Sequence, residues 1–487
     1  MIDLRLVPAA LTAWAVTAAG ILWATPGALA AVSVAVTATA LAGLWGHRAR
    51  RATDRRAAVA AVVAVLTVGA GFAVAVVLRV DAAHRHPVTD YIGDLTTVVV
   101  APSETPRSLA GARVMFRGAL LTLDDTPASG TVVVFASGAD YARLSPGQPA
   151  AFRARVAAPT RRDLTVAVLA AVGEPTPGEA APIHRAAHHV RGQFAQAARR
   201  VLPPEQAAVL PAVVLGDTTA VPPTTTADFR ASGLAHLTAV SGANVTIVCG
   251  AVLLSAALIG PRAAVVAAAL ALAGFVVVVQ PSPSVLRAAV MGAITLLAVL
   301  SHRRRQALPA LAATVVLLMV AAPELAVDVG FALSVSATAA LVLIAPGWSR
   351  RLVARGWPKP LADAVSVALA AQVVTAPLVA GISGSVSLVA VAANLAAAPV
   401  IAPITVLGTA AAAVGIGWPA GAELLIRFTG PEVWWLLRVA HLSAGLPAAS
   451  VPVPAGAAGV VTVAIGGLAV GAVWHWVVSP RHDTIGR

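Results

Sequence analysis

Apolar segments long enough to cross a lipid bilayer recur along this chain. A helix needs about 20 predominantly apolar residues to span the hydrocarbon core of a membrane. Windows of that kind lie at 7–24, 28–46, 57–78, 234–259, 263–280, 284–300, 307–321, 324–345, 362–381, 386–401, 403–417 and 456–478. The composition agrees, since 58% of the residues are hydrophobic and only 11% are charged. The sequence therefore predicts a polytopic α-helical membrane protein with about 10–12 transmembrane helices.

The stretch between the third and fourth windows has a different pattern. Short β-branched runs alternate there with Gly, Pro, Asp and Ser, which is typical of strands joined by turns. The runs are ARVMFRGALLTL, GTVVVFASG, QPAAFRARVAA and DLTVAVLAAVGEP. We therefore expect a small β domain over residues 81–182. Because strands alternate between two faces, its aromatic residues are expected mainly in the core; they are Phe116, Phe135, Tyr141 and Phe152.

The segment that follows, 183–230, is expected to form amphipathic or interfacial helices. Residues 183–201, IHRAAHHVRGQFAQAARRV, place apolar side chains at helical spacing with Arg and His opposite. Such a helix suits the plane of a membrane interface.

Basic loops predict the orientation of the helices, because Arg and Lys accumulate in short cytoplasmic loops. The basic positions are 47–56, Arg262, 302–305, 349–359 and the tail 479–487. All of them fall on one side if the N-terminus is cytoplasmic. Both termini are then cytoplasmic and the β domain is extracytoplasmic. This topology largely explains the formal net charge of +13, so charge alone does not indicate a polyanion partner. The resulting division is 1–80, 81–182, 183–230, a polytopic domain over 231–478, and the tail 479–487.

Polar side chains interrupt several of the apolar windows. An amide or charged group in hydrocarbon costs several kcal/mol if it stays unsatisfied. Two interpretations are open: the groups bond across neighbouring helices, or they face a shared polar passage. For Arg287, a buried ion pair with Asp328 is a further alternative. The number of windows with such groups beside Gly or Pro favours a passage; the candidates for its lining are His236, Ser241, Asn244, Arg287, Gln372 and Asn394.

Motifs of nucleotide-binding and hydrolytic proteins are missing from the sequence. It contains no Walker A loop, no GxGxxG motif opening a helix and no HExxH motif. Cys249 is the only cysteine, and no second His or carboxylate stands at metal-ligand spacing from His236. We therefore expect no enzymatic activity, no metal and no cofactor.

The stretch LGDTTAVPPTTTADFRASGLAHLTAVSGANVTIV, residues 215–248, resembles the signature of ComEC-type competence proteins, the DNA-uptake channels of the cytoplasmic membrane. The matching positions are Gly216, Asp217, Arg230, Ser232, Gly233, His236, Ser241, Gly242 and Val245. The likeness continues in PSVLRA at 283–288, DVGFALS at 328–334, QVVTAPL at 372–378 and Asn394 with its following prolines. It covers roughly residues 202–404. Where many members have a second histidine, this chain has Ala243 and Asn244.

The resemblance implies passage of single-stranded DNA into the cytoplasm during natural transformation. It implies that the β domain is OB-fold-like, with possible DNA contacts at Arg113, Arg117, Arg153 and Arg155. It gives a structural role to the motif residues Gly216, Asp217, Arg230, Ser232, Gly233 and Gly242, and to Asp328. The implied partners, besides the lipid bilayer, are an external DNA receptor and a cytosolic helicase or motor.

Many relatives also carry a C-terminal metallo-β-lactamase-like domain, whereas this sequence stops at Arg487, so nuclease activity is not expected. A secondary transporter of a small solute or ion and a membrane scaffold are the alternative functions.

Overall fold

The computed structural model describes residues 4–23, 52–109, 111, 113–301 and 306–478. The chain forms two compact units: Met1–Gln193 with Cys249–Ala332, and Phe194–Val248 with Leu333–Arg487. The predicted window 28–46 and the basic segments 302–305 and 479–487 lie outside the described residues.

The helices of the first unit form two packed groups, linked by the contact of α10 with α11. They are α1 (Val7–Leu22), α3 (Ala52–His84), α9 (Pro261–Val279), α10 (Pro283–Leu300), α11 (Ala307–Ala321) and the 3-10 turn η3 (Pro323–Val327). α1 packs against α3, α11 and η3, while α9 packs against α10. The Trp14 indole fixes α1 in place, because it donates to the Ala326 carbonyl at 2.9 Å and meets the Phe331 ring edge-on, with ring centroids 5.4 Å apart.

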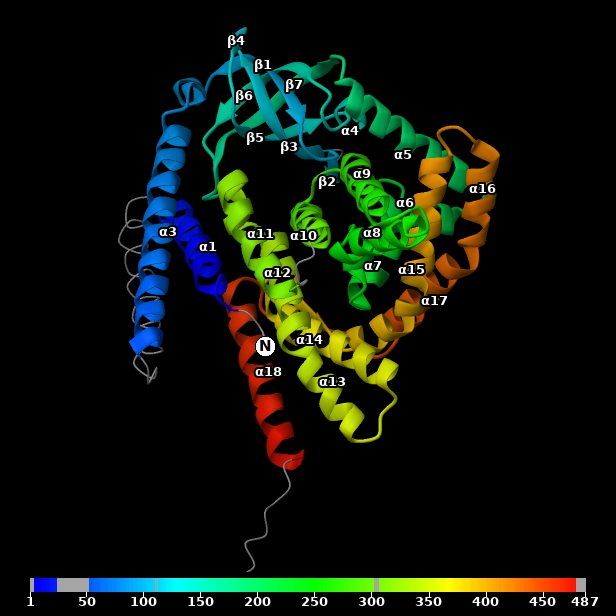
Figure 1. The fold of residues 1–487 in the computed structure, drawn as a ribbon. Helices are drawn as coiled ribbons and strands as arrows, with labels where there is room; N and C mark the ends of the chain where they lie inside the picture. The colour runs from blue at the N-terminus through cyan, green and yellow to red at the C-terminus, as the bar shows by residue number, and fades with distance from the viewer. Residues whose placement is uncertain (1–3, 24–51, 110, 112, 302–305, 479–487) are drawn as a thin grey trace, which may run out of the picture. The chain divides into compact units, whose positions relative to one another are not determined.

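The β domain of the first unit is a closed sheet (Figure 1). Its elements are η1 (Pro87–Tyr91), β1 (Leu95–Pro102), β2 (Arg107–Leu109), β3 (Arg113–Leu123), β4 (Thr126–Pro127), β5 (Thr131–Ser137), α4 (Ala139–Arg143), β6 (Ala150–Ala157) and β7 (Thr165–Pro177). The main strands follow the order β1-β6-β7-β5-β3, and an additional β1–β3 pairing closes the ring. Only the β5–β7 pair is parallel among the described strands. The four predicted runs are confirmed as β3, β5, β6 and β7.

Strand alternation decides which aromatic residues form the core of this domain. Phe116, Tyr141 and Phe152 are at most 4% exposed, and the Tyr141 and Phe152 rings meet edge-on at 5.5 Å. The prediction that Phe135 belongs to the core is wrong, because its side chain is 42% exposed. On β5 the inward positions are taken by Val132, Val134 and Ala136, so the residue between the last two points outward.

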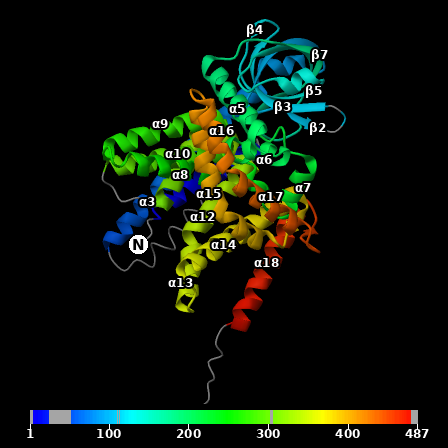
Figure 2. The same ribbon diagram turned by 90° about the vertical axis from the view of Figure 1, so that its right-hand side faces the viewer.

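The second unit is helical. It contains α6 (Pro204–Leu215), α7 (Pro223–Ala231), η2 (Ala235–Leu237), α13 (Ala345–Ala354), α14 (Lys359–Ser383), β8 (Ser385–Ser387), α15 (Ala390–Val414), α16 (Pro419–Phe428), α17 (Gly430–Ala444), β9 (Ser450–Pro452) and α18 (Ala457–Val478). α15 packs against α6, α14, α16 and α17, and Figure 2 shows its place beside α16 and α17. Three helices have one part in each unit: α5 (Pro182–Val201), α8 (Gly242–Ala256) and α12 (Val329–Leu343). α5 confirms the helix predicted over 183–201.

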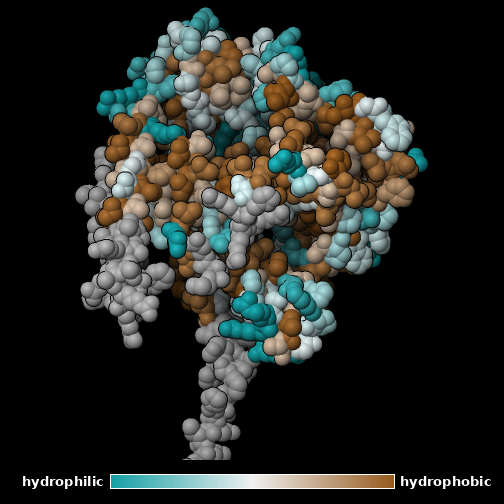
Figure 3. All heavy atoms as spheres, in the orientation of Figure 1, coloured by the Kyte–Doolittle hydropathy of each residue, from teal (hydrophilic) through white to brown (hydrophobic). Residues whose placement is uncertain are grey.

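Six helical segments are long and apolar enough to cross a membrane. They are Val62–Tyr91, Pro261–Val279, Pro283–Leu300, Val329–Ala354, Lys359–Ser383 and Ala390–Val414. Five shorter apolar helices accompany them among the described residues: Val7–Leu22, Pro204–Leu215, Gly242–Ala256, Ala307–Ala321 and Ala457–Ala469. Hydrophobic residues dominate the visible surface of the helices in Figure 3, whereas hydrophilic ones gather over the strands and α13. The chain is therefore a polytopic membrane protein.

Two of the predicted boundaries are wrong. The windows 386–401 and 403–417 form one helix, α15, which runs through Pro399 and Pro403. Membrane helices tolerate internal proline because neighbouring groups satisfy the freed carbonyls. The window 234–259 does not form a continuous crossing, because α8 begins only at Gly242 and the turn η2 precedes it.

Burial of Tyr141 predicts that its phenol loses its proton at a higher pH than an exposed tyrosine does. Burial raises the pKa of its phenol to about 12, from an ordinary value near 10. Between these values the unfolded chain loses the proton first, so the free energy of unfolding falls as pH rises. The chain has two tyrosines, and tyrosinate absorbance of the detergent-purified protein should lose its step near pH 12 in Tyr141→Phe and keep it in Tyr91→Phe. If the step lost in Tyr141→Phe lies near pH 10, the phenol is not shielded.

Candidate functional site

The signature segment begins where α6 stops. Gly216 adopts a left-handed conformation with φ of 71°, and its N–H bonds back to the Ala212 carbonyl at 3.0 Å. The next N–H, of Asp217, reaches the Pro211 carbonyl at 3.2 Å. The Asp217 carboxylate accepts from the N–H and the hydroxyl of Thr219, at 3.2 and 2.6 Å. This glycine and this aspartate therefore end one helix and shape the turn that follows.

Asn244 closes the same helix end from the first turn of α8. Its Nδ2 donates to the Val213 carbonyl at 3.0 Å, and its Oδ1 accepts from the Ser241 hydroxyl at 3.4 Å. Carbonyls in the last turn of a helix have no partner within the helix, so this amide satisfies one of them. The side chain is only 4% exposed. Asn244 therefore bonds to a neighbouring helix, and Ser241 bonds to Asn244. This is the first of the two interpretations that the sequence left open for these polar groups.

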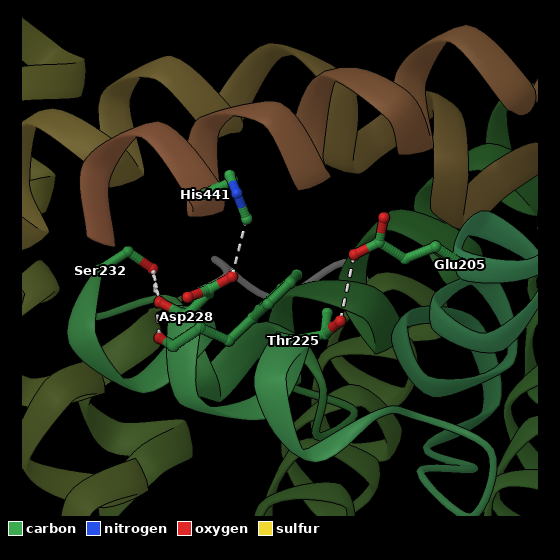
Figure 4. Close-up of polar contacts among 6 residues, drawn as sticks. Glu205, Thr225, Asp228, Ser232 and His441 are labelled. Atoms are coloured by element: carbon green, nitrogen blue, oxygen red, sulfur yellow. Dashed lines mark hydrogen bonds and ion pairs between the residues drawn. The ribbon is translucent and has the colours of Figure 1, made fainter. Parts of the chain in front are cut away.

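Polar contacts hold α7 against α6 and α17 (Figure 4). The Thr225 hydroxyl donates to Glu205 Oε1 at 3.1 Å, and His441 Nδ1 lies 2.9 Å from Asp228 Oδ2. At the end of α7, the buried Ser232 hydroxyl donates to the Asp228 carbonyl at 2.7 Å. Thr225 and Asp228 therefore hold α7 against α6 and α17, whereas Ser232 satisfies a carbonyl at the end of α7 itself.

Gly233 brings the end of α7 into direct contact with α15. A Cβ on this residue would lie 2.4 Å from the Cβ of Ala390 and 3.1 Å from its Cα, and its φ of +75° already disfavours other residues. The Ser387 hydroxyl donates to the Ala231 carbonyl at 2.7 Å beside this contact. The Ala390 carbonyl accepts from Asn394 Nδ2 at 2.8 Å. The glycine thus allows the signature segment to dock on the first turn of α15. We call this contact of Gly233 with Ala390, together with the Ser387–Ala231 hydrogen bond, the joint.

His236 follows this joint, in η2. Its side chain is exposed, and the ring is hydrogen-bonded to the Gly233 backbone. A neutral imidazole offers one hydrogen-bond donor and one acceptor.

The remaining lining candidates are more scattered. Gln372 on α14 is half-buried, and within the described part of the chain its amide has no hydrogen-bond partner. Arg287 on α10 is 6% exposed, with Nη1 3.1 Å from Met291 Sδ, and belongs to the other compact unit. The structure therefore brings His236 and Asn394 to the joint at Gly233, while Ser241 and Asn244 meet at the end of α6.

The other motif residues lie at helix ends. Asp328 accepts from the Phe331 N–H at 2.8 Å and so caps α12, whereas Gly242 is the first residue of α8. Arg230 is exposed near the end of α7. Among the described residues, no three His, Cys, Asp or Glu side chains gather as a metal site would require.

Comparison with known proteins identifies the family. A family model described as Competence protein matches residues 213–478, which is more than half of the 487-residue chain. The chain belongs to the competence protein family. This confirms the resemblance to ComEC-type competence proteins, and family membership points to a role in DNA uptake during transformation. No curated protein matches the chain, and no solved structure matches it.

The contacts that build the competence-family joint were missed by sequence reasoning. Glu205, Ser387, Ala390 and His441 come from separate helices and turns, and each is an ordinary residue in its own stretch. Of the residues in these contacts, only Gly233 was indicated by the sequence, because glycine permits close approach between backbones.

Gly233→Ala should destabilise the protein by about 2–4 kcal/mol, because it combines a left-handed backbone with a collision against Ala390. The measurement is the thermal midpoint in detergent, with the amount of protein in the membrane. Gly250→Ala is the matched control, because a Cβ there meets nothing within 4 Å. Equal midpoints for the two variants would contradict the close-contact role.

Proposed function

We propose that this protein is the cytoplasmic-membrane channel through which single-stranded DNA enters the cell during natural transformation. The observation that carries the proposal is the family match over residues 213–478, the polytopic part that contains the joint. The joint supports it further, since it leaves the side chain of His236 exposed beside the close contact of Gly233 with Ala390.

The chemistry of the candidate lining suits a moving polyanion. A path for DNA must offer donors to phosphates without binding them so tightly that the strand stalls. His236 and the amides of Gln372 and Asn394, which belong to the same compact unit, provide such donors. The carboxylates of Asp217 and Asp328 are bonded to neighbouring backbone N–H groups, so they are placed to shape helix ends and not to face DNA.

The β domain would receive DNA outside the membrane. Its closed ring of five main strands, with one parallel pair, supports an OB-fold, which in other proteins binds single strands. Arg113 and Arg117 on β3 and Arg153 and Arg155 on β6 alternate with buried residues and therefore point outward. Phe135, outward on β5 opposite Met115, adds an aromatic face on which a base could stack.

The rest of the proposal concerns sidedness and partners. The basic loops favour cytoplasmic termini and an extracytoplasmic β domain. In this account the chain itself is not an enzyme, an external receptor delivers DNA, and a cytosolic helicase or motor draws it in.

Entry of labelled DNA into the protected cytosolic fraction of a deletion strain tests the function. Complementation with the native gene should restore entry. His236→Ala should reduce entry at least tenfold at an unchanged amount of membrane protein, whereas His236→Gln, which keeps a neutral donor and acceptor, should retain most of it. Thr246→Ala is the control, because this exposed hydroxyl bonds only to its own helix at Gly242.

Normal entry in the deletion strain would contradict the function itself. Normal entry in His236→Ala would remove this side chain from the path, and solute flux in place of DNA entry would favour a transporter.

Salt dependence tests the arginine face of the β domain. Replacing both Arg153 and Arg155 by Gln in the full-length protein should weaken oligonucleotide binding. The slope of log K against log salt should fall by about 0.7 for each phosphate that the variant no longer neutralises. Arg143→Gln is the control, because this exposed arginine is paired with Asp140 on α4. An unchanged slope in the double variant would exclude these arginines from binding phosphate.

A further inference from the structure

A cavity of about 620 Å³ lies in the first unit, where two apolar helices end against the β domain. The end of α1 contributes Leu22 and Trp23, and the last turns of α3 contribute Val80 and Ala83. The segment between β6 and β7 supplies the opposite wall. Figure 1 shows how α3 runs up to this part of the sheet.

The wall from the β domain is cationic. Arg161 and Arg162 line the cavity and both are exposed. Arg162 Nη1 donates to the Leu22 carbonyl at 3.0 Å, which caps α1, while Arg161 has no ion-pair or hydrogen-bond partner among the described residues. The carboxylate of Asp163 also lines the cavity, but its Oδ1 accepts from the Thr165 N–H at 3.0 Å. The cavity therefore has an unpartnered guanidinium above a mainly apolar floor, to which α3 also contributes His84.

The position of the cavity along α3 matches the boundary of a bilayer. The candidate membrane span Val62–Tyr91 ends beside it, and Trp23, 52% exposed at the end of α1, is the residue type that prefers the membrane–water interface. A second, apolar cavity of about 390 Å³ lies along the preceding turns of α3, lined by Val68, Phe72 and Val76. An amphiphile with an anionic headgroup and a hydrocarbon tail fits a cationic cavity that is followed along α3 by an apolar one.

We propose that the cavity at Arg161 and Arg162 binds the phosphate headgroup of an anionic membrane phospholipid, with an acyl chain along α3. Guanidinium groups bind phosphate in a paired geometry, and the apolar floor excludes a ligand that is polar throughout. The bound lipid would join α1 and α3 to the β6–β7 segment. The inference does not depend on the proposed function, because it uses only the membrane helices and the cavity.

The test uses full-length protein in detergent and native mass spectrometry, with thermal midpoints measured in parallel. Phosphatidylglycerol should stay bound and raise the midpoint, and phosphatidylcholine should do so at least fivefold more weakly. Arg161→Gln should weaken phosphatidylglycerol binding at least fivefold, and Arg161→Lys should recover part of it. Arg85→Gln is the matched control, because Arg85 follows α3, is exposed, and pairs with Asp81.

Several outcomes would overturn the proposal. Equal binding of the two lipids, or equal losses in Arg161→Gln and Arg85→Gln, would remove the headgroup site. Binding of glycerol 3-phosphate as tight as that of the lipid would make it a small-anion site. Displacement of the lipid by a single-stranded oligonucleotide would assign the arginines to nucleic acid. The midpoints of the lipid-free variants show whether Arg161→Gln still folds.

Discussion

Hydrocarbon offers no hydrogen-bond partner, and this constraint shapes every polar side chain in the helical part of the protein. A polar group there must bond to protein or meet water. Thr314 illustrates the simplest solution, because its buried hydroxyl donates to the Ala310 carbonyl one turn earlier in the same helix. Asn244 and Asp328 illustrate a second, because each satisfies backbone groups at the end of a helix. The polar groups that are not fully buried in such pairings include the exposed His236 and the half-buried Gln372.

The residues of the competence-family signature mainly end short helices and dock them against neighbouring helices. Gly216 and Asp217 stop α6, Ser232 closes α7, and Gly233 lets the chain touch α15. The chain between α6 and α8 is thereby divided into the short helix α7, the turn η2 and the non-helical residues between them. Non-helical backbone in membrane proteins occurs where protein or water surrounds it. The joint is therefore compatible with a wet path beside it.

The sequence allowed the strands of the β domain to be predicted, because a period of two and turn residues are local signals. The amphipathic helix α5 was predictable for the same reason. Long-range packing could not be predicted from the sequence. The pairing of Asp228 with His441 joins residues 213 positions apart, and neither carries a local signal. The predicted windows divided α15 into two crossings, although the helix runs through Pro399 and Pro403, and Phe135 was expected in the core, although it faces outward on β5. For Asn244, an amide in an apolar segment indicated that a polar partner was needed, but the sequence did not identify that partner as the Val213 carbonyl.

Water accessibility of single cysteines tests most directly whether His236, Gln372 and Asn394 share a wet path. In a Cys249→Ala background, which removes the only native cysteine, the variants His236→Cys, Gln372→Cys and Asn394→Cys should react with a membrane-impermeant maleimide, and single-stranded DNA should slow all three. Asn244→Cys, in a buried contact, should stay unlabelled. Protection of all four positions from the maleimide, or labelling that DNA does not change, would contradict the account.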